Sequence, residues 1–455
     1  MNLRGEIMQF NFKKNTKLKG VQILALGFLA VILIGALILT LPISSASGET
    51  TDFLDALFTS TSAVCVTGLV TLDTGTHWSM FGQTIIMLLI EIGGLGFMSF
   101  TTLIAIILGK KITLRDRLIL QDAMNTFSIQ GLVKMVQYVL TFTVTVQLSG
   151  ALLFSTQFIP QYGIFKGLFY SLFHSISAFC NAGFDLFGNF SSLTSYSSNW
   201  VVILVASALV IIGGIGFAVW IEIYNFKSIK KLSLHSKMVI LVTAVLIVGG
   251  TILMFIFEHN NPNTLANMNM GDKVVNSFFA AVTPRTAGFN SISTDGMTNA
   301  GNLLTIILMF IGGSPGSTAG GIKTTTIGVL LVTVICVIKG RDDAEVFKKR
   351  FPKELIYKAF TLFFIGGFLV IGATMLLSYT EQGASFLSLL YETTSAFGTV
   401  GLTVGLTQQL SEVGKVLIMI MMYLGRVGPL TVVLSLMRNK NNNGVRYPEG
   451  KILIG

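Results

Sequence analysis

The sequence predicts an all-α polytopic membrane protein with eight transmembrane helices, arranged as four repeats of helix, short re-entrant helix and helix. Only 11% of its 455 residues are Asp, Glu, Lys or Arg and 52% are hydrophobic, whereas soluble proteins carry about 25% charged residues. Long apolar stretches recur, as do four short apolar segments that end in glycine. A soluble enzyme, a disordered chain and a disulfide-stapled secreted domain are therefore excluded.

The expected spans follow from the charge-free stretches, because a helix needs about 20 mostly apolar residues to cross the hydrocarbon core. Four stretches contain no Asp, Glu, Lys or Arg: Gly20 to Gly48, Met135 to Phe165, Met238 to Phe257 and Ala359 to Thr380. Four others each contain one such residue: Trp78 to Gly109 with Glu91, Trp200 to Phe226 with Glu222, Gly301 to Ile338 with Lys323, and Val416 to Met437 with Arg426.

Basic residues predict the orientation, because Lys and Arg gather in cytoplasmic loops. The net charge is +10, and the clusters recur after every second span. They lie at Lys13 to Lys19, Lys110 to Arg117, Lys227 to Lys237, Lys339 to Lys353 and Arg438 to Lys451. We therefore expect a multi-pass protein of the plasma membrane with both termini in the cytoplasm. The charges are dispersed beside apolar spans, so the lipid bilayer is the expected partner and nucleic acid is not.

Four segments in the outer connections align on a glycine and define the repeats. They read LFTSTSAVCVTGL from Leu57, LFHSISAFCNAGF from Leu172, SFFAAVTPRTAGF from Ser277 and LYETTSAFGTVGL from Leu390. An aromatic residue stands ten positions before each glycine, and a glycine cluster follows in the next span. The expected divisions are an N-terminal tail (1–19), repeats at 20–130, 131–233, 234–350 and 351–437, and a C-terminal tail (438–455).

The physics of the bilayer indicates what such a unit does. Non-helical backbone at membrane depth is tolerated where it is buried in protein or lines a water-filled path. Four short helices can point their partially negative C-terminal ends at one axis, and the extended residues after them can turn carbonyl oxygens inward. Such a ring replaces the hydration shell of a monovalent cation. Glycine permits the close approach and the positive φ that this geometry requires.

On these segments the chain resembles the Trk/Ktr/HKT superfamily of potassium transporters, most closely the membrane subunits of bacterial Ktr systems. The resemblance extends from about Gly20 to the C-terminus. It implies four M1-pore helix-M2 repeats around a pseudo-four-fold, K+-channel-like pore, and a homodimer. It also implies a cytosolic octameric ring of RCK (KtrA-like) subunits that binds ATP or ADP and regulates the pore. This chain lacks a Walker A or G-x-G-x-x-G motif, so we expect no nucleotide on the chain itself.

The resemblance also assigns a selectivity filter for K+, the transported ion. In the family, a serine in place of the first filter glycine is associated with Na+ permeation. This chain has a glycine there, Gly68, which favours K+ selectivity. Na+ is retained as a candidate second ion. Close helix packing is the alternative role for these glycines. The expected filter residues are Val66, Thr67, Gly68, Asn181, Ala182, Gly183, Thr286, Ala287, Gly288, Thr399, Val400 and Gly401.

The third M2 span is expected to break, because five glycines and a proline remove helix stability at membrane mid-depth. The family resemblance implies a gate loop here beneath the filter, with its polar side chains facing water; a packing kink is the alternative. The expected gating residues are Gly312, Gly313, Ser314, Pro315, Gly316, Ser317, Thr318, Gly320, Gly321, Lys323 and Arg426.

Charges within the membrane are expensive and indicate function. Arg426 is expected to act as a barrier below the filter or to hydrogen-bond the gate loop, and Lys323 has the same two interpretations. We also expect Arg285 and Glu392 to pair behind the filter. The three cysteines and four histidines show no metal-ligand spacing.

The sequence therefore favours K+ uptake by a channel-like mechanism. A Na+- or H+-coupled K+ symporter is the alternative, although carboxylates along the pathway are few. An intramembrane enzyme would need a nucleophile or metal cluster at depth, and none is found in the sequence. A scaffold would leave the four matched segments unexplained.

Overall fold

The computed structural model describes residues 20–96, 132–225 and 232–428. The two predicted cytoplasmic tails, 1–19 and 438–455, and most of the predicted basic clusters at 110–117 and 227–237 lie outside these residues. The described chain is helical apart from its connections and one hairpin, as the composition predicts.

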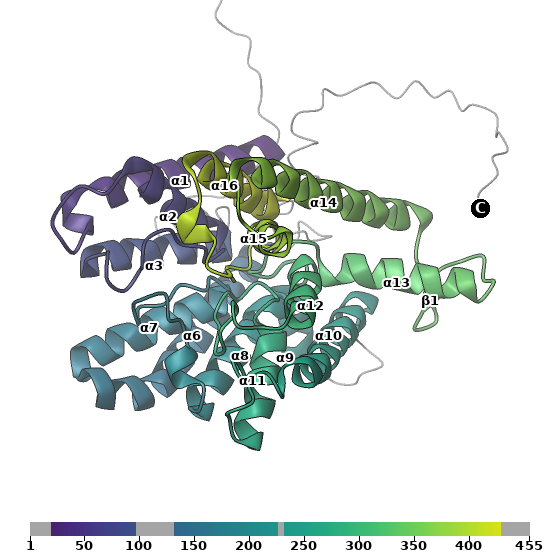
Figure 1. Ribbon diagram of the computed structural model, residues 1–455. Helices are drawn as coiled ribbons and strands as arrows, with labels where there is room; N and C mark the ends of the chain where they lie inside the picture. The colour runs from purple at the N-terminus through teal and green to yellow at the C-terminus, as the bar shows by residue number, and fades with distance from the viewer. Residues whose placement is uncertain (1–19, 97–131, 226–231, 429–455) are drawn as a thin grey trace, which may run out of the picture.

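Four long helices alternate with shorter ones along the chain (Figure 1). Each is at least 18 residues long and apolar enough to cross a membrane, and they match the four charge-free stretches of the sequence. Side chains such as Leu37, Phe368 and Met375 remain exposed on them, as expected for a surface that faces lipid. The four are α1 (Gly20–Thr40), α6 (Leu132–Tyr162), α10 (Leu234–Glu258) and α14 (Lys353–Thr380).

A short, deeply buried helix follows each long helix. Three of the four end three residues before the aligned glycine, whereas the third ends six residues before it, at Val282. In the third repeat Phe279 is fully buried, whereas Phe278, the aromatic residue that the alignment on the glycine predicts at this position, is only half-buried. We call these short helices pore helices, after the sequence prediction; they are α2 (Phe53–Cys65), α7 (Ile164–Cys180), α11 (Met270–Val282) and α15 (Phe386–Gly398).

A third set of helices begins after the connections that follow the short buried helices. A polar residue caps the first turn of each by accepting a backbone N–H, and these caps are Ser79, Asn199, Thr298 and Ser411. Such caps fix where a helix begins. The helices are α3 (Met80–Leu95), α8 (Trp200–Ile215), α12 (Asn299–Phe310) and α16 (Glu412–Val427).

Two of the second spans, in the second and third repeats, are interrupted within the described residues; the sequence predicts the break in the third repeat but not the one in the second. α8 and α9 (Phe217–Tyr224) meet at an angle of 98°, because Gly216 has a φ of +103° and Phe217 donates its N–H to the Gly316 carbonyl. α12 and α13 (Thr324–Ile338) are separated by residues 311–323. α3 and α16 end beside Gly96 and Gly428, which also have positive φ.

The four units close into a ring. Each helix of the third set packs against the pore helix of the following unit: α3 on α7, α8 on α11, α12 on α15, and α16 back on α2. Figure 1 shows the first and last units, purple and yellow, side by side as this closure requires. The remaining elements are short: η1 (Pro42–Ser44), η2 (Thr194–Tyr196), η4 (Thr407–Gln409), and the hairpin β1 (Glu345–Val346) and β2 (Lys349–Arg350).

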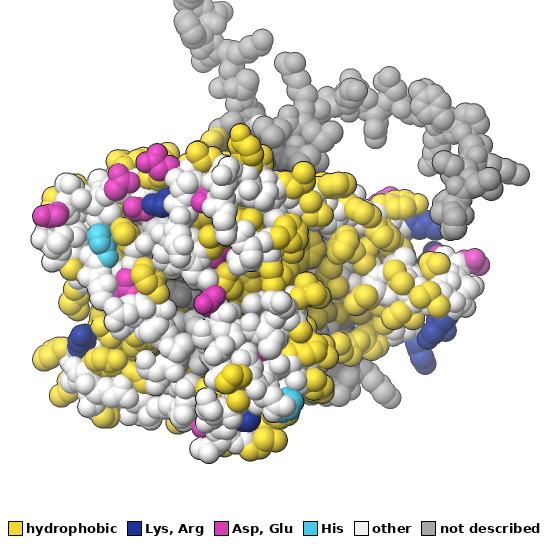
Figure 2. Space-filling model, in the orientation of Figure 1, with side chains coloured by type: hydrophobic (Ala, Val, Ile, Leu, Met, Phe, Trp, Pro, Cys, Tyr) yellow, Lys and Arg dark blue, Asp and Glu magenta, His cyan; other side chains and the backbone are white. Residues whose placement is uncertain are grey.

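The surface divides by side-chain type. Figure 2 shows hydrophobic side chains over α13 and α14, several acidic side chains around the connections of α1 to α3, and basic side chains around the hairpin. The hairpin contains Lys348, Lys349 and Arg350, within the basic cluster that the sequence places on the cytoplasmic side.

Candidate functional site

The segments after the four pore helices share one backbone conformation. The residue two before each aligned glycine is left-handed, although it is not glycine: Val66, Asn181, Thr286 and Thr399 have φ values of 57°, 61°, 72° and 50°. Such values are uncommon for non-glycine residues and persist where the surroundings enforce them. Three different kinds of side chain (Val, Asn and Thr) adopt it at one register, so the surrounding fold imposes the conformation.

The four aligned glycines form a closed ring. Each has a positive φ, and a Cβ placed on it would lie within 2.8 Å of a carbonyl oxygen on the next segment. Gly68 faces the Ala182 carbonyl, Gly183 that of Ala287, Gly288 that of Val400, and Gly401 that of Thr67. The segments therefore converge on one axis in chain order, with no room for any side chain at the glycine positions.

Hydroxyl groups on three of the pore helices, and on the residue that follows α11, hold these segments from behind. Ser62 Oγ accepts the N–H of Gly68 at 3.0 Å, and Ser395 Oγ accepts that of Gly401 at 3.1 Å. Ser177 and Thr283 donate instead to the carbonyls of Phe184 and Phe289. The sequence analysis did not predict these contacts. Three of the segments have a serine six residues before the aligned glycine, and this repeated position could have indicated them.

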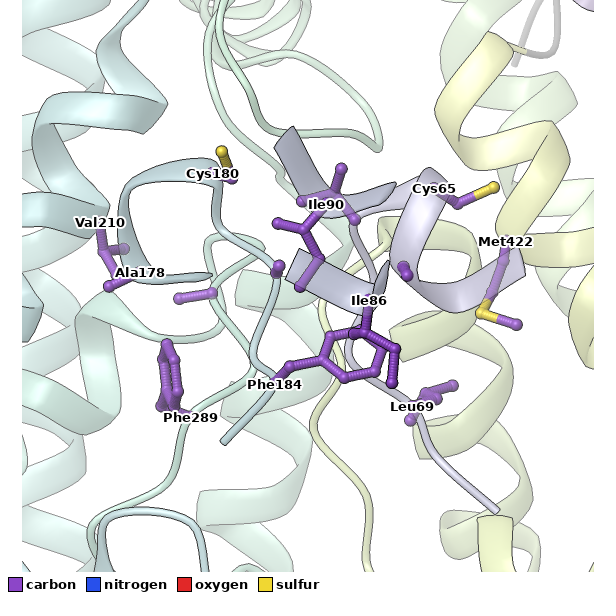
Figure 3. Close-up of a cluster of buried hydrophobic side chains, with 14 of the residues drawn as sticks. Cys65, Leu69, Ile86, Ile90, Ala178, Cys180, Phe184, Val210, Phe289 and Met422 are labelled. Carbon is purple, nitrogen blue, oxygen red and sulfur yellow. The ribbon is translucent and has the colours of Figure 1, made fainter. Parts of the chain in front are cut away.

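The residue after each glycine anchors the segment in the apolar core. Leu69, Phe184, Phe289 and Leu402 are at most 3% exposed. Figure 3 shows the first three on the strands beyond the pore helices, and Cys65 and Cys180 at the ends of α2 and α7. The cysteines Cys65, Cys180 and Cys336 are buried and form no disulfide among the described residues.

The glycine clusters of the third helix set allow these helices to lie close to the backbone of the pore helices. A Cβ at Gly93, Gly213 or Gly425 would overlap the carbonyl oxygen of Val64, Phe179 or Phe397, each four residues before the aligned glycine of its repeat. These helices thus press on the ends of their own pore helices. The third unit differs, because Gly312 faces the backbone of Gly320 within the loop that interrupts the helix.

That loop, residues 311–323, lies inside the protein beneath the ring. Ile311 and Ile322 pair at its base, and the N–H groups of Ser314 and Thr318 donate to the carbonyls of Gly214 and Gly213. A Cβ at Gly320 would overlap Thr399 Oγ1, so the loop contacts a residue of the ring directly.

Two cations hold the loop. Arg426 on α16 donates to the carbonyls of Thr318, Gly93 and Gly94, and so bridges the loop to α3. Lys323 Nζ donates to the Ala319 carbonyl at 2.6 Å. The sequence placed both cations near the loop, and the structure adds that Arg426 ties the loop to the first unit.

Two expectations about this region are wrong. Ser314 and Thr318 do not face water: both are fully buried, because Ser314 bonds to Thr324 and Thr318 donates to the Phe179 carbonyl. Arg285 and Glu392 do not pair either. Arg285 donates to Thr243 Oγ1, whereas the Glu392 carboxylate binds Thr403, Thr407 and the Val404 N–H.

Within the described residues, no group of three or more His, Cys, Asp and Glu side chains could hold a metal ion. The ligands that the ring offers are instead backbone carbonyls, with the hydroxyls of Thr67 and Thr399 buried beside them and unpaired. Carbonyl oxygens without carboxylates suit a weakly hydrated monovalent cation better than a divalent one.

Comparison with known proteins agrees with this geometry. A family model described as "Cation transport protein", TrkH, matches residues 8–444. The chain belongs to the TrkH family. It is 48% identical to the potassium/sodium uptake protein NtpJ of Enterococcus hirae, covering 96% of this chain and 98% of that one. It is 45% identical to the Ktr system potassium uptake protein B of Bacillus subtilis, covering 95% and 96%.

The fold is also found among solved structures. The crystal structure of the potassium transporter TrkH from Vibrio parahaemolyticus matches with a TM-score of 0.71 over 93% of this chain and 86% of that one. The sequence identity is 18%, so this likeness concerns the fold. The all-α polytopic membrane fold of the TrkH family is therefore the fold of this chain.

Proposed function

We propose that this chain is a K+ uptake subunit in which K+ passes through the four-glycine ring by a channel-like mechanism. The observation that carries the proposal is the closed ring, in which each glycine faces a carbonyl of the next segment. Three pore helices end three residues before their glycines, and the partial negative charge of a helix C-terminus favours a cation there. The names of the relatives, which specify potassium uptake, support the choice of ion.

Control of the flux is assigned to the loop at 311–323. It contacts the ring through Gly320 and Thr399, and Arg426 places a positive charge on the same side of the ring. A cation leaving the filter would meet both the loop and this charge. Release of the loop from Arg426 and from α8 would therefore open the path.

The wider assembly belongs to the same proposal. The chain forms a homodimer in the plasma membrane with both termini in the cytoplasm. A cytosolic octameric RCK ring, KtrA-like, binds ATP or ADP and regulates the loop. The naming of relatives as parts of a Ktr system supports a partner subunit, and the basic hairpin at residues 345–350 is a cytoplasmic surface on this chain that a partner could contact.

The test is ion uptake into proteoliposomes that contain this chain alone, with K+, Rb+ and Na+ gradients and with Gly68→Ser beside the wild type. We expect K+ and Rb+ to enter in preference to Na+. Gly68→Ser should erode that preference, because its Cβ would lie within 2.8 Å of the Ala182 carbonyl at a φ of +95°. Gly249→Ala on α10 is the matched control, since no atom lies within 4 Å of the added methyl group.

A Na+- or H+-coupled symporter is the second candidate, and the potassium/sodium uptake name of one relative favours it. Uptake of K+ that requires a Na+ or H+ gradient would support the symporter. A Gly68→Ser variant with unchanged selectivity would count against a filter made of these carbonyls.

A further inference from the structure

One position on the pore helices makes a contact that differs between the repeats. It lies nine residues before each filter glycine and is occupied by Thr59, His174, Phe279 and Glu392. In two of the four, the side chain accepts the backbone N–H that lies three residues beyond the glycine. His174 Nε2 accepts from Leu186 at 3.3 Å, and Glu392 Oε1 accepts from Val404 at 3.2 Å.

The partners of His174 define its tautomer. Nδ1 lies 2.7 Å from the Tyr170 carbonyl, which can only accept, so this nitrogen carries the proton. The Leu186 N–H can only donate, so Nε2 is unprotonated. The ring is buried, 2% exposed, and stacks on Phe187 at 4.3 Å between ring centroids. His174 is therefore a fixed, neutral link between its pore helix and the strand beyond the ring.

Glu392 performs the same task with more contacts. Oε1 accepts from the Thr403 hydroxyl as well as from Val404, and Oε2 accepts from Thr407 at 2.7 Å. The Thr403 carbonyl in turn accepts the hydroxyl of Thr294 on the neighbouring unit at 2.5 Å. The partners of this buried carboxylate are donors on the strand beyond Gly401 and at the start of η4, and the described residues provide no cation for it.

The first and third repeats lack the link. The Thr59 hydroxyl is buried without a hydrogen-bond partner, and Phe279 has no polar atom. Because the ring closes in the order of the repeats, the second and fourth segments lie opposite each other. The side chain at this position therefore links the pore helix to the strand beyond the ring in the second and fourth repeats, which lie opposite each other, and not in the first and third.

We propose that His174 and Glu392 are positioning residues that set the ion selectivity of the ring. This inference rests on the proposed function. A strand held at both Phe184 and Leu186, or at both Gly401 and Val404, cannot move toward the axis to coordinate a smaller ion. Removing either link lets the carbonyls at that corner approach the axis, which favours Na+ over K+. Neither residue contacts the ion.

Matched substitutions separate the link from simple packing. His174→Gln retains an acceptor near the position of Nε2, whereas His174→Asn retains the bond to Tyr170 but does not reach Leu186. Glu392→Gln retains an acceptor for Val404, whereas Glu392→Leu fills the volume without one. Thr59→Val is the control at the same register of the first repeat, because the hydroxyl that it removes has no partner.

The measurement is the ratio of K+ to Na+ uptake in proteoliposomes, with KM and maximal rate for K+ and a thermal unfolding curve for each variant. We expect His174→Asn and Glu392→Leu to lower the ratio by about tenfold, which corresponds to about 1.4 kcal/mol, the order of one hydrogen bond. The Gln variants and Thr59→Val should keep the ratio of the wild type.

The outcomes distinguish the inference from the function on which it rests. A normal ratio in His174→Asn and Glu392→Leu, with only the maximal rate or the unfolding temperature reduced, would overturn the inference and leave the filter intact. If Glu392→Leu does not fold, His174→Asn alone decides, because it tests an independent link. A wild type that fails to prefer K+ over Na+ would instead overturn the proposed function.

Discussion

Lys415 on α16 and Asp55 on α2 form an ion pair, with 2.6 Å between Nζ and Oδ1. The two residues are 360 positions apart, and their contact joins the last unit of the ring to the first. The side chains are 17% and 18% exposed, so water screens the pair only in part. The ring is thus closed at its outer side by a charge pair and at its centre by the approach of Gly401 to Thr67.

Removing one partner should destabilise this closure. Lys415→Met leaves the partly enclosed Asp55 carboxylate without its cation, and Asp55→Asn leaves the Lys415 ammonium without its anion. We expect a loss of about 1–3 kcal/mol in stability, below the cost for a fully buried pair. Thermal unfolding of the purified protein in detergent measures the loss. The double reversal, Asp55→Lys with Lys415→Asp, should regain part of it, and the absence of any recovery would contradict the importance of the pair.

Arg426 should restrain the flux. Arg426→Ala removes the charge and frees the carbonyls of Thr318, Gly93 and Gly94. Loss of one charge-assisted hydrogen bond, about 1.5–3 kcal/mol, would raise the initial rate of Rb+ uptake about tenfold if that bond limits opening. Arg426→Lys keeps the charge without the planar fork that bridges loop and helix, so its rate should be intermediate. An Arg426→Ala variant with the rate of the wild type would exclude the restraint.

Shortening the loop tests the gate itself. Deletion of residues 313–320 removes the contacts with α8, Thr399 and Arg426, so K+ flux should rise about tenfold or more, since these contacts together exceed one hydrogen bond. The experiment compares uptake with and without the cytosolic nucleotide-binding partner. Flux and nucleotide response that both match the wild type would remove the gating role.

Much of this architecture could be predicted from the sequence, because its signals are local. Charge-free length predicted α1, α6, α10 and α14, and the glycine register aligned four segments that share a left-handed residue. The break in the third M2 span followed from its glycines and proline. These features depend on composition and backbone sterics, which act within a few residues.

Contacts between distant segments could not be predicted in the same way. The expected pair of Arg285 with Glu392 assumed that opposite charges near one glycine register must meet, but hydroxyl and backbone donors on its own strand satisfy Glu392. The bend at Gly216 arises because the loop of another unit supplies the carbonyl of Gly316. A single sequence does not indicate such partners, and the polar loop residues were misjudged as water-facing for the same reason.

Gly93, Gly213 and Gly425 should tolerate no side chain. A Cβ at Gly213 would overlap the Phe179 carbonyl, which is backbone and cannot move aside. We expect Gly213→Ala to destabilise the protein by about 1–3 kcal/mol, the usual cost of overpacking. Gly249→Ala should instead stabilise by up to about 1 kcal/mol, because alanine favours the helix and the site is open. Equal unfolding temperatures for the two variants would contradict the close approach.

Asp185, in the outer connection after Gly183, should make stability depend on pH. Burial raises the pKa of this carboxyl from 3.8 to about 7, and Asp73 adds to the rise, while the N–H of Phe187 opposes it. Between pH 3.8 and about 7 the folded state therefore keeps a proton that the unfolded state releases. The protonated carboxyl thus makes its full contribution to stability below pH 3.8, and this contribution is lost as the pH rises to about 7. Asp185→Asn is the control variant, because it retains an acceptor for Phe187 but cannot ionise. From pH 5 to 8 the unfolding temperature of the wild type should fall by a few degrees relative to that of Asp185→Asn. If the two unfolding temperatures change in parallel with pH, the carboxyl does not titrate in this range.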